Sequence, residues 1–163
     1  MNKTKKTALY GILTALALIL GYIETLIPAF VAIPGMKIGL TNIAVLISLY
    51  AVSERAAIII NIVRIIILAM LFGSPLSFVF SLVGGCLSTA VMILLKKTDR
   101  FGMIGVSTAG GVTHNIGQII VAMLVMNTRA IALYLPILWI TGIFSGMLVG
   151  FIGGMIAARI RTD

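Results

Sequence analysis

The chain consists of long apolar runs separated by short breaks that contain charged residues, proline or glycine. Most runs approach the roughly 20 apolar residues that a helix needs to cross a bilayer. Strand-like alternation is absent, and a backbone in lipid must satisfy its own hydrogen bonds, so helices are expected. The pattern predicts a six-helix transmembrane bundle with spans at about 7–27, 39–53, 56–72, 76–95, 103–126 and 131–158. The run at 39–53 is short, and whether it crosses fully stays open.

Composition supports the same conclusion. Hydrophobic residues make up 61% of the 163 residues and charged residues 10%, whereas soluble domains carry about 25% charged residues. We therefore expect one integral membrane domain over residues 1–163, surrounded by lipid. The net charge of +8 does not predict nucleic-acid binding, because the basic residues punctuate the apolar runs and form no patch. One histidine and one cysteine predict no metal site, and no cofactor motif is present.

The basic residues predict an orientation, since lysine and arginine concentrate in cytoplasmic loops. If the N-terminus is cytoplasmic, six crossings place nine basic residues inside, two outside (Lys37 and Arg129), and Arg64 within a span. This bias requires an even number of crossings. Both termini are therefore predicted to be cytoplasmic.

Small residues recur at helical spacing in two spans. In the last span Gly142, Gly146, Gly150 and Gly154 lie four residues apart, on one helix face that predicts close packing of a neighbouring helix. In the first span Gly11 and Ala15 have the same spacing. There the alternative of docking another protein stays open, because an N-terminal helix often lies at the edge of a bundle.

Polar residues inside the spans are the candidate binding groups. Arg64 lies at the centre of the third span, where an ionisable side chain costs several kcal/mol and usually faces a cavity or a partner. A structural ion pair is the alternative, but Glu24 is the sole candidate carboxylate within the spans, which favours a ligand as the counter-charge. In the fifth span His114 and Gln118 share a glycine-lined face, with Asn115 beside it.

The predicted orientation gives these groups a common depth. Glu24, Lys37, Asn42 and Gln118 fall in the outer half of the bilayer, with His114 central and Arg64 deepest. Together they predict a pocket that opens outward. The Pro- and Gly-containing segment 28–38 would be its lid, because loops that order over a ligand are common.

Three motifs carry a resemblance to a known family: PGMKIGLTNIAVLISLY, VRIIILAMLFGSPLSFVFSLVGG and GVSTAGGVTHNIGQ. They resemble the bacterial Gx transporter family, often labelled heptaprenyl diphosphate synthase component I, over nearly the whole chain. The matching positions are Pro34, Gly35, Lys37, Gly39, Asn42, Arg64, Gly73, Ser81, Gly84, Gly85, His114, Asn115, Gly117 and Gln118.

The resemblance implies more than the residues alone. The family is similar to the substrate-binding S components of energy-coupling factor transporters, which have six helices and an outward pocket capped by a loop. It implies a bacterial cytoplasmic membrane protein that docks a transmembrane coupling subunit through Gly11 and Ala15 and works with a separate ATPase. The family's association with flavin, quinone and electron-transfer genes hints at a substrate class.

Prenyl-chain elongation needs aspartate-rich motifs that hold Mg²⁺ around a diphosphate. The chain has four acidic residues in all and no cluster of them, so we expect no such catalysis. We expect a transport subunit that binds a small polar or anionic organic solute, such as a flavin, quinone precursor or prenyl diphosphate. The alternatives are a proton-coupled secondary transporter and a non-transporting membrane partner of a prenyl-synthesis or redox complex.

Overall fold

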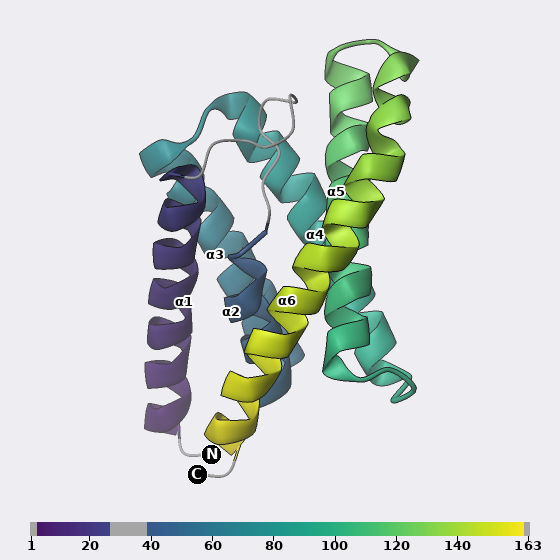
Figure 1. Ribbon diagram of the computed structural model, residues 1–163. Helices are drawn as coiled ribbons and strands as arrows, with labels where there is room; N and C mark the ends of the chain where they lie inside the picture. The colour runs from purple at the N-terminus through teal and green to yellow at the C-terminus, as the bar shows by residue number, and fades with distance from the viewer. Residues whose placement is uncertain (1–2, 27–38, 162–163) are drawn as a thin grey trace.

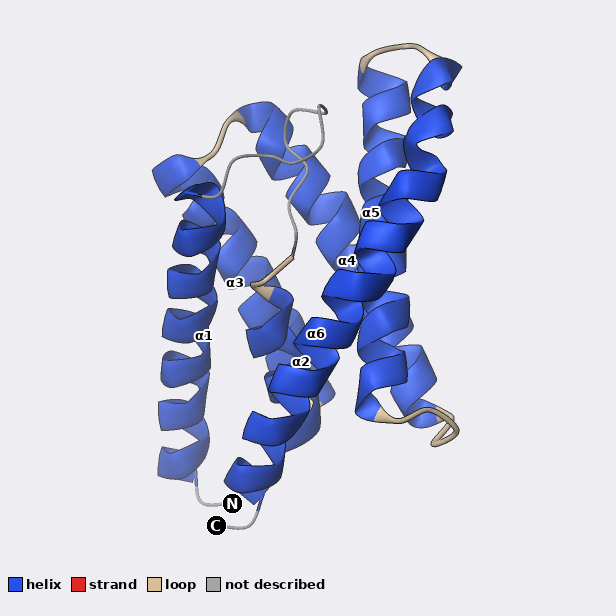
Figure 2. Ribbon diagram, in the orientation of Figure 1, coloured by secondary structure: helices blue, strands red, loops and turns tan. Residues whose placement is uncertain are grey.

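The computed structural model describes residues 3–26 and 39–161, and these form helices joined by short connections (Figures 1 and 2). The predicted lid at 28–38, with Lys37, lies outside the described residues. In chain order the elements are α1 (Lys3–Leu26), α2 (Asn42–Ala51), α3 (Glu54–Phe72), α4 (Pro75–Lys97), α5 (Met103–Val125), a 3₁₀ helix η1 (Arg129–Tyr134) and α6 (Leu135–Arg161). The predicted all-helical class is confirmed.

Five of these helical segments are long and apolar enough to cross a membrane. The exception is α2, whose 10 residues correspond to about 15 Å, half of the roughly 30 Å hydrocarbon core. The start of α1 and the end of α6 lie at the same end of the bundle, which is also the end of the α2–α3 and α4–α5 connections (Figure 1).

Local sequence explains where the helices begin. The Ser53 side chain accepts a hydrogen bond from the Ala56 N–H at 3.1 Å, and so caps α3. The Ser74 side chain does the same for α4 by accepting from the Ser77 N–H at 3.1 Å, and Pro75 occupies the first turn. Proline suits that position because its missing N–H would have had no helical partner.

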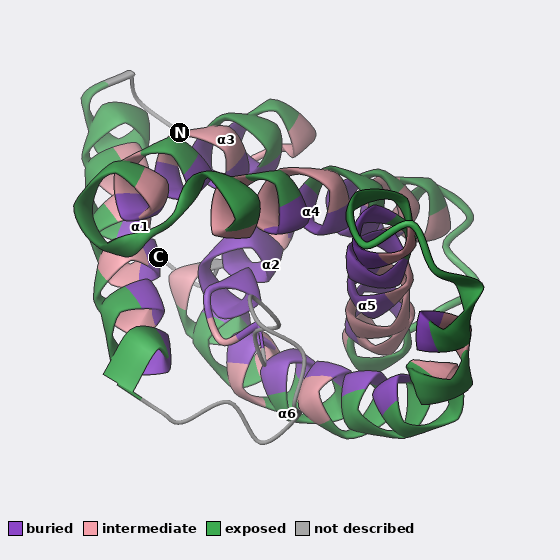
Figure 3. Ribbon diagram, turned by 90° about the horizontal axis from the view of Figure 1, so that it is seen from above, coloured by how far each residue is buried: buried purple, intermediate pink, exposed green. Residues whose placement is uncertain are grey.

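The short helix α2 forms the centre of the bundle. All eight residues from Asn42 to Leu49 are buried, and seen from above α2 lies inside a ring formed by the other helices (Figure 3). A helix that is apolar on every side needs apolar surroundings on every side, and around α2 the other helices supply them. The uninterrupted run Ile43–Ile47 therefore follows from the position of α2.

Glycines set the closest helix contacts. A Cβ atom built on Gly146 of α6 would lie 2.6 Å from the Thr108 Cα of α5, and one on Gly150 would lie 2.7 Å from the Ile104 Cα. Between α4 and α5, a Cβ on Gly117 would lie 2.9 Å from the Gly84 Cα. At these places the backbones approach too closely for any side chain, as small residues permit in lipid.

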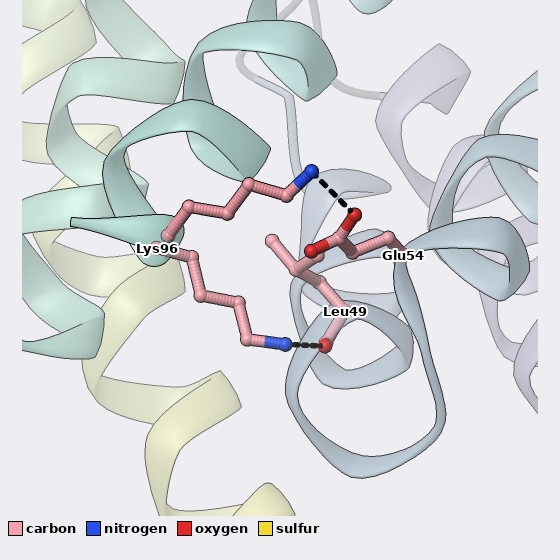
Figure 4. A network of polar contacts seen from close by, with 4 residues as sticks. Leu49, Glu54 and Lys96 are labelled. Carbon is pink, nitrogen blue, oxygen red and sulfur yellow. Dashed lines mark hydrogen bonds and ion pairs between the residues drawn. The ribbon is translucent and has the colours of Figure 1, made fainter. Parts of the chain in front are cut away.

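The end of α4 is tied to the α2–α3 connection (Figure 4). The Lys96 ammonium donates a hydrogen bond to the Leu49 carbonyl at 2.6 Å, and it lies 5.1 Å from the centroid of the Tyr50 ring. Lys97 forms an ion pair with Glu54 at 3.1 Å. The Lys96 ammonium therefore bonds a carbonyl near the C-terminal end of α2, where a positive charge stabilises the helix.

We expect Lys96→Met to lower the free energy of unfolding by about 1 kcal/mol, because the Leu49 carbonyl loses its charged donor. Lys97→Met, which breaks only an exposed ion pair, should cost less, about 0–1 kcal/mol. Thermal unfolding in detergent measures both. An equal loss of unfolding free energy in the two variants would show that the Lys96–Leu49 hydrogen bond does not stabilise the fold.

Candidate functional site

The buried guanidinium of Arg64 organises a cluster of polar side chains in the middle of the bundle. Arg64 is 5% exposed. Its Nη2 donates to Asn61 Oδ1 at 2.7 Å and to Asn42 Oδ1 at 3.0 Å, and its Nε donates to Asn61 Oδ1 at 3.0 Å. Its Nη1 donates to the Thr41 hydroxyl. These bonds hold the start of α2 against α3.

The Glu24 carboxylate reaches the same region from the last turn of α1. Glu24 is 6% exposed, and its Oε1 accepts a hydrogen bond from the Gly39 N–H. Gly39 has a φ of +89°, a left-handed conformation that favours glycine. The chain therefore enters α2 through a turn held by a carboxylate from α1.

Two small cavities adjoin this cluster. The first has a volume of about 20 Å³, and its polar lining includes Glu24, Thr41, Arg64, Ser77 and Ser81. The second has a volume of about 10 Å³. Gly39 and His114 line both. The first can hold about one water molecule, whereas an organic solute needs a site of roughly 300 Å³ or more. Neither of these two cavities, as described, has room for an organic solute.

The remaining predicted residues of α5 take different places. Asn115 lines the second cavity, but its Nδ2 donates to the Leu138 carbonyl of α6 at 2.8 Å, which ties the two helices together. Gln118 is 0% exposed and lies beside Gly84 at the α4–α5 contact. Among the described residues it lines neither cavity. The structure thus brings Glu24, Asn42, Arg64, His114 and Asn115 to the cavities.

Several residues that line the cavities were not among the predicted site residues. Thr41, Ser77 and Ser88 belong to the cavity walls, and sequence reasoning did not select them. The spacing along α4 does contain a pattern: Ser77, Ser81, Gly84 and Ser88 recur every three or four residues and share one face. That small polar face on an apolar helix could have identified the wall.

The predicted docking residues lie on the outside of the bundle. Gly11 and Ala15 are exposed, and, apart from its chain neighbours and the nearby backbone of α1, no described atom lies within 4 Å of a Cβ built on Gly11. On α6, Gly142, Gly146 and Gly150 pack against α5, whereas a Cβ on Gly154 would have an ordinary 3.5 Å contact with the Met103 sulfur.

A larger apolar groove of about 350 Å³ lies between the end of α3 and the start of α4. Its lining is apolar except for Ser74, and it is separate from the charged cluster. Such a surface suits contact with lipid chains.

The fold and the buried polar cluster define a multi-pass α-helical membrane protein. The chain belongs to the family described as heptaprenyl diphosphate synthase component I, also called the Gx transporter family, whose model matches residues 13–156. No curated protein and no solved structure matches the chain.

Proposed function

We propose that the protein is a membrane transport subunit that binds a small polar or anionic organic solute from the outer side. The observation that carries this proposal is the cluster of Glu24, Asn42, Arg64 and His114, contributed by four helices around two cavities. Burying charged groups in an apolar bundle is costly and usually serves a ligand or ion. Flavins, quinone precursors and prenyl diphosphates are the solute classes proposed.

The proposed topology has six crossings with both termini in the cytoplasm of a bacterium. It is supported by the basic residues at one end of the bundle, where α1 starts and α6 ends (Figure 1). The cavities would then be reached from the opposite, outer end. By resemblance to S components, a transmembrane coupling subunit docking at Gly11 and Ala15 and a separate ATPase would drive transport.

The test is the identity of a small molecule retained on the purified protein, measured by mass spectrometry. His114→Ala should reduce its occupancy about tenfold or more, because a lost hydrogen bond to a buried polar ligand costs about 1.5–3 kcal/mol. Thr113→Val is the matched control, because the neighbouring Thr113 hydroxyl bonds to the Ala109 carbonyl of its own helix. Unchanged occupancy in His114→Ala would refute this site.

A proton-coupled secondary transporter is the second candidate, because Glu24 and His114, both able to exchange protons, line one cavity. Uptake into liposomes by the purified protein, driven by a proton gradient without ATP, would favour it. Dependence on ATP and on a co-purifying coupling subunit would favour the first proposal.

We also propose that the chain does not catalyse prenyl elongation by itself. The described carboxylates Glu24, Glu54 and Asp99 lie on α1, at the start of α3 and after α4, so they offer no paired Mg²⁺ ligands. The family description still allows a third role, as a non-transporting membrane partner of a prenyl-synthesis or redox complex. That role predicts a stable complex with a soluble enzyme and an empty bundle.

A further inference from the structure

Among the described residues that line the first cavity, Arg64 is a positive group held in a fixed position. Arg64 is held by Thr41, Asn42 and Asn61 through the four hydrogen bonds described above. Three side chains on two elements therefore define the position of the guanidinium. A cation fixed in this way in an apolar bundle requires a nearby counter-charge.

The buried start of α2 adds to this positive field. The N-terminal end of a helix carries a partial positive charge, and α2 begins inside the bundle (Figure 1). The Thr41 side chain makes no cap hydrogen bond to α2, and its hydroxyl accepts from Arg64. The Asn42 and Ile43 N–H groups donate to the Gly39 and Leu40 carbonyls of the preceding turn. Half-helices that begin within a membrane protein commonly direct this end at an anionic ligand.

An unpartnered hydroxyl marks the adjoining second cavity. Ser88 is fully buried, and among the described residues its Oγ has no hydrogen-bond partner. It lines that cavity together with Gly39 and Asn42, the residues around the start of α2. Buried polar groups are nearly always hydrogen-bonded, so this hydroxyl can bond to a water or a polar group that enters the cavity.

Among the described residues, Glu24 supplies a counter-charge to Arg64. It is the one acidic residue among the described residues that line either cavity. Its carboxylate accepts from the Gly39 N–H and attracts the Arg64 guanidinium. It comes from the last turn of α1, a less constrained position than that of Arg64, because a terminal helical turn can open without disturbing the rest of the helix.

We propose that Glu24 is an internal counter-anion that occupies the place of a phosphate or carboxylate group of the ligand, and that the ligand displaces it. The proposal rests on the proposed function and assigns the anionic end of the solute to the site formed by Arg64, the Gly39 N–H and the start of α2. Two anions beside one cation would repel each other in a medium of low dielectric constant. Ligand binding and the Glu24 contact are therefore mutually exclusive.

The test is the response of the purified full-length protein to inorganic phosphate, measured as thermal unfolding in lipid-free detergent at constant ionic strength. A ligand that binds only the folded state raises the unfolding midpoint according to its affinity. Glu24→Gln keeps an oxygen acceptor for the Gly39 N–H but removes the competing charge. The unfolding midpoint of Glu24→Gln should rise at about tenfold lower phosphate concentration than that of the wild type. The reason is that removing a competing buried charge should strengthen phosphate binding by about tenfold or more.

The matched control is Glu54→Gln, which removes a carboxylate from the exposed pair with Lys97 and should respond like the wild type. If Glu24→Gln alone is too unstable, the double variant Glu24→Gln with Arg64→Gln removes both charges and should fold without any phosphate response. A second arm replaces phosphate with phosphatidic acid in mixed micelles, against diacylglycerol. A response of Glu24→Gln at lower concentration than that of the wild type, in either arm, supports the proposal. The arm that shows it identifies a free solute or a lipid headgroup.

Two results would overturn the proposal. One is a Glu24→Gln response equal to that of the wild type, and the other is a phosphate response that survives in the double variant. Either would leave the retained-molecule experiment to decide the proposed function separately, because that experiment does not depend on where the anionic group binds.

Discussion

Arg64→Met is expected to lower the free energy of unfolding by about 3–5 kcal/mol, the cost of breaking a buried network of charged hydrogen bonds. Methionine fills a similar length of space, so packing changes little. However, the Glu24 carboxylate loses the attraction of the guanidinium, and the oxygens of Thr41, Asn42 and Asn61 lose their donor. The same substitution should abolish retention of the solute. Thermal unfolding and mass spectrometry of the purified variant measure the two effects.

Arg129→Met is the control for Arg64→Met. Arg129 is exposed at the start of η1, and its substitution should change stability by no more than about 0.5 kcal/mol. If the two variants unfold alike, the hydrogen bonds of Arg64 do not hold the start of α2, and the described cluster is not the organising feature of the site.

Gly146→Ala is expected to destabilise the bundle by about 1–3 kcal/mol, the usual cost of overpacking. The added methyl group would lie 2.6 Å from the Thr108 Cα and 2.8 Å from the Ser107 carbonyl oxygen. Both are backbone atoms of α5, so no rotamer change can relieve the contact. The helices must separate along their whole contact, and unfolding in detergent should reveal this as a lower midpoint.

Gly154→Ala on the same helix provides the comparison. A Cβ there meets only the Met103 sulfur at 3.5 Å, and alanine stabilises a helix relative to glycine by up to about 1 kcal/mol. This variant should therefore be neutral or slightly more stable. A loss as large as that of Gly146→Ala would mean that flexibility of α6, rather than its contact with α5, explains the effect.

Much of the fold follows from the pattern of apolar runs. The helices α3, α4 and α5 lie within a few residues of the predicted ranges, because proline, glycine and charged residues end each run where lipid can no longer surround the chain. The start of α6 differs, since residues 129–134 form a 3₁₀ helix before it. A hydropathy pattern does not distinguish a 3₁₀ turn from an α-helical one.

The candidate site was partly accessible from the sequence. A charged or polar residue in an apolar run is conspicuous, and this identified Arg64, His114 and Glu24 as candidates. Hydrogen-bond partners are not conspicuous, so Thr41 was overlooked although it accepts from Arg64. Asn115 and Gln118 share a helix with His114, yet the first bonds to α6 and the second lies between α4 and α5. Which neighbour covers a helix face is decided by tertiary packing.

The shortness of α2 has a consequence for biosynthesis. Ten residues are too few to be recognised as an independent membrane segment, which needs close to 20. The start of α2 is also bonded to α3, because Arg64 donates to the side chains of Thr41 and Asn42. Only Val52 and Ser53 separate α2 from α3. We therefore expect the two helices to enter the bilayer as one hairpin, with α2 reaching its final depth only after α1 and α3 have come together.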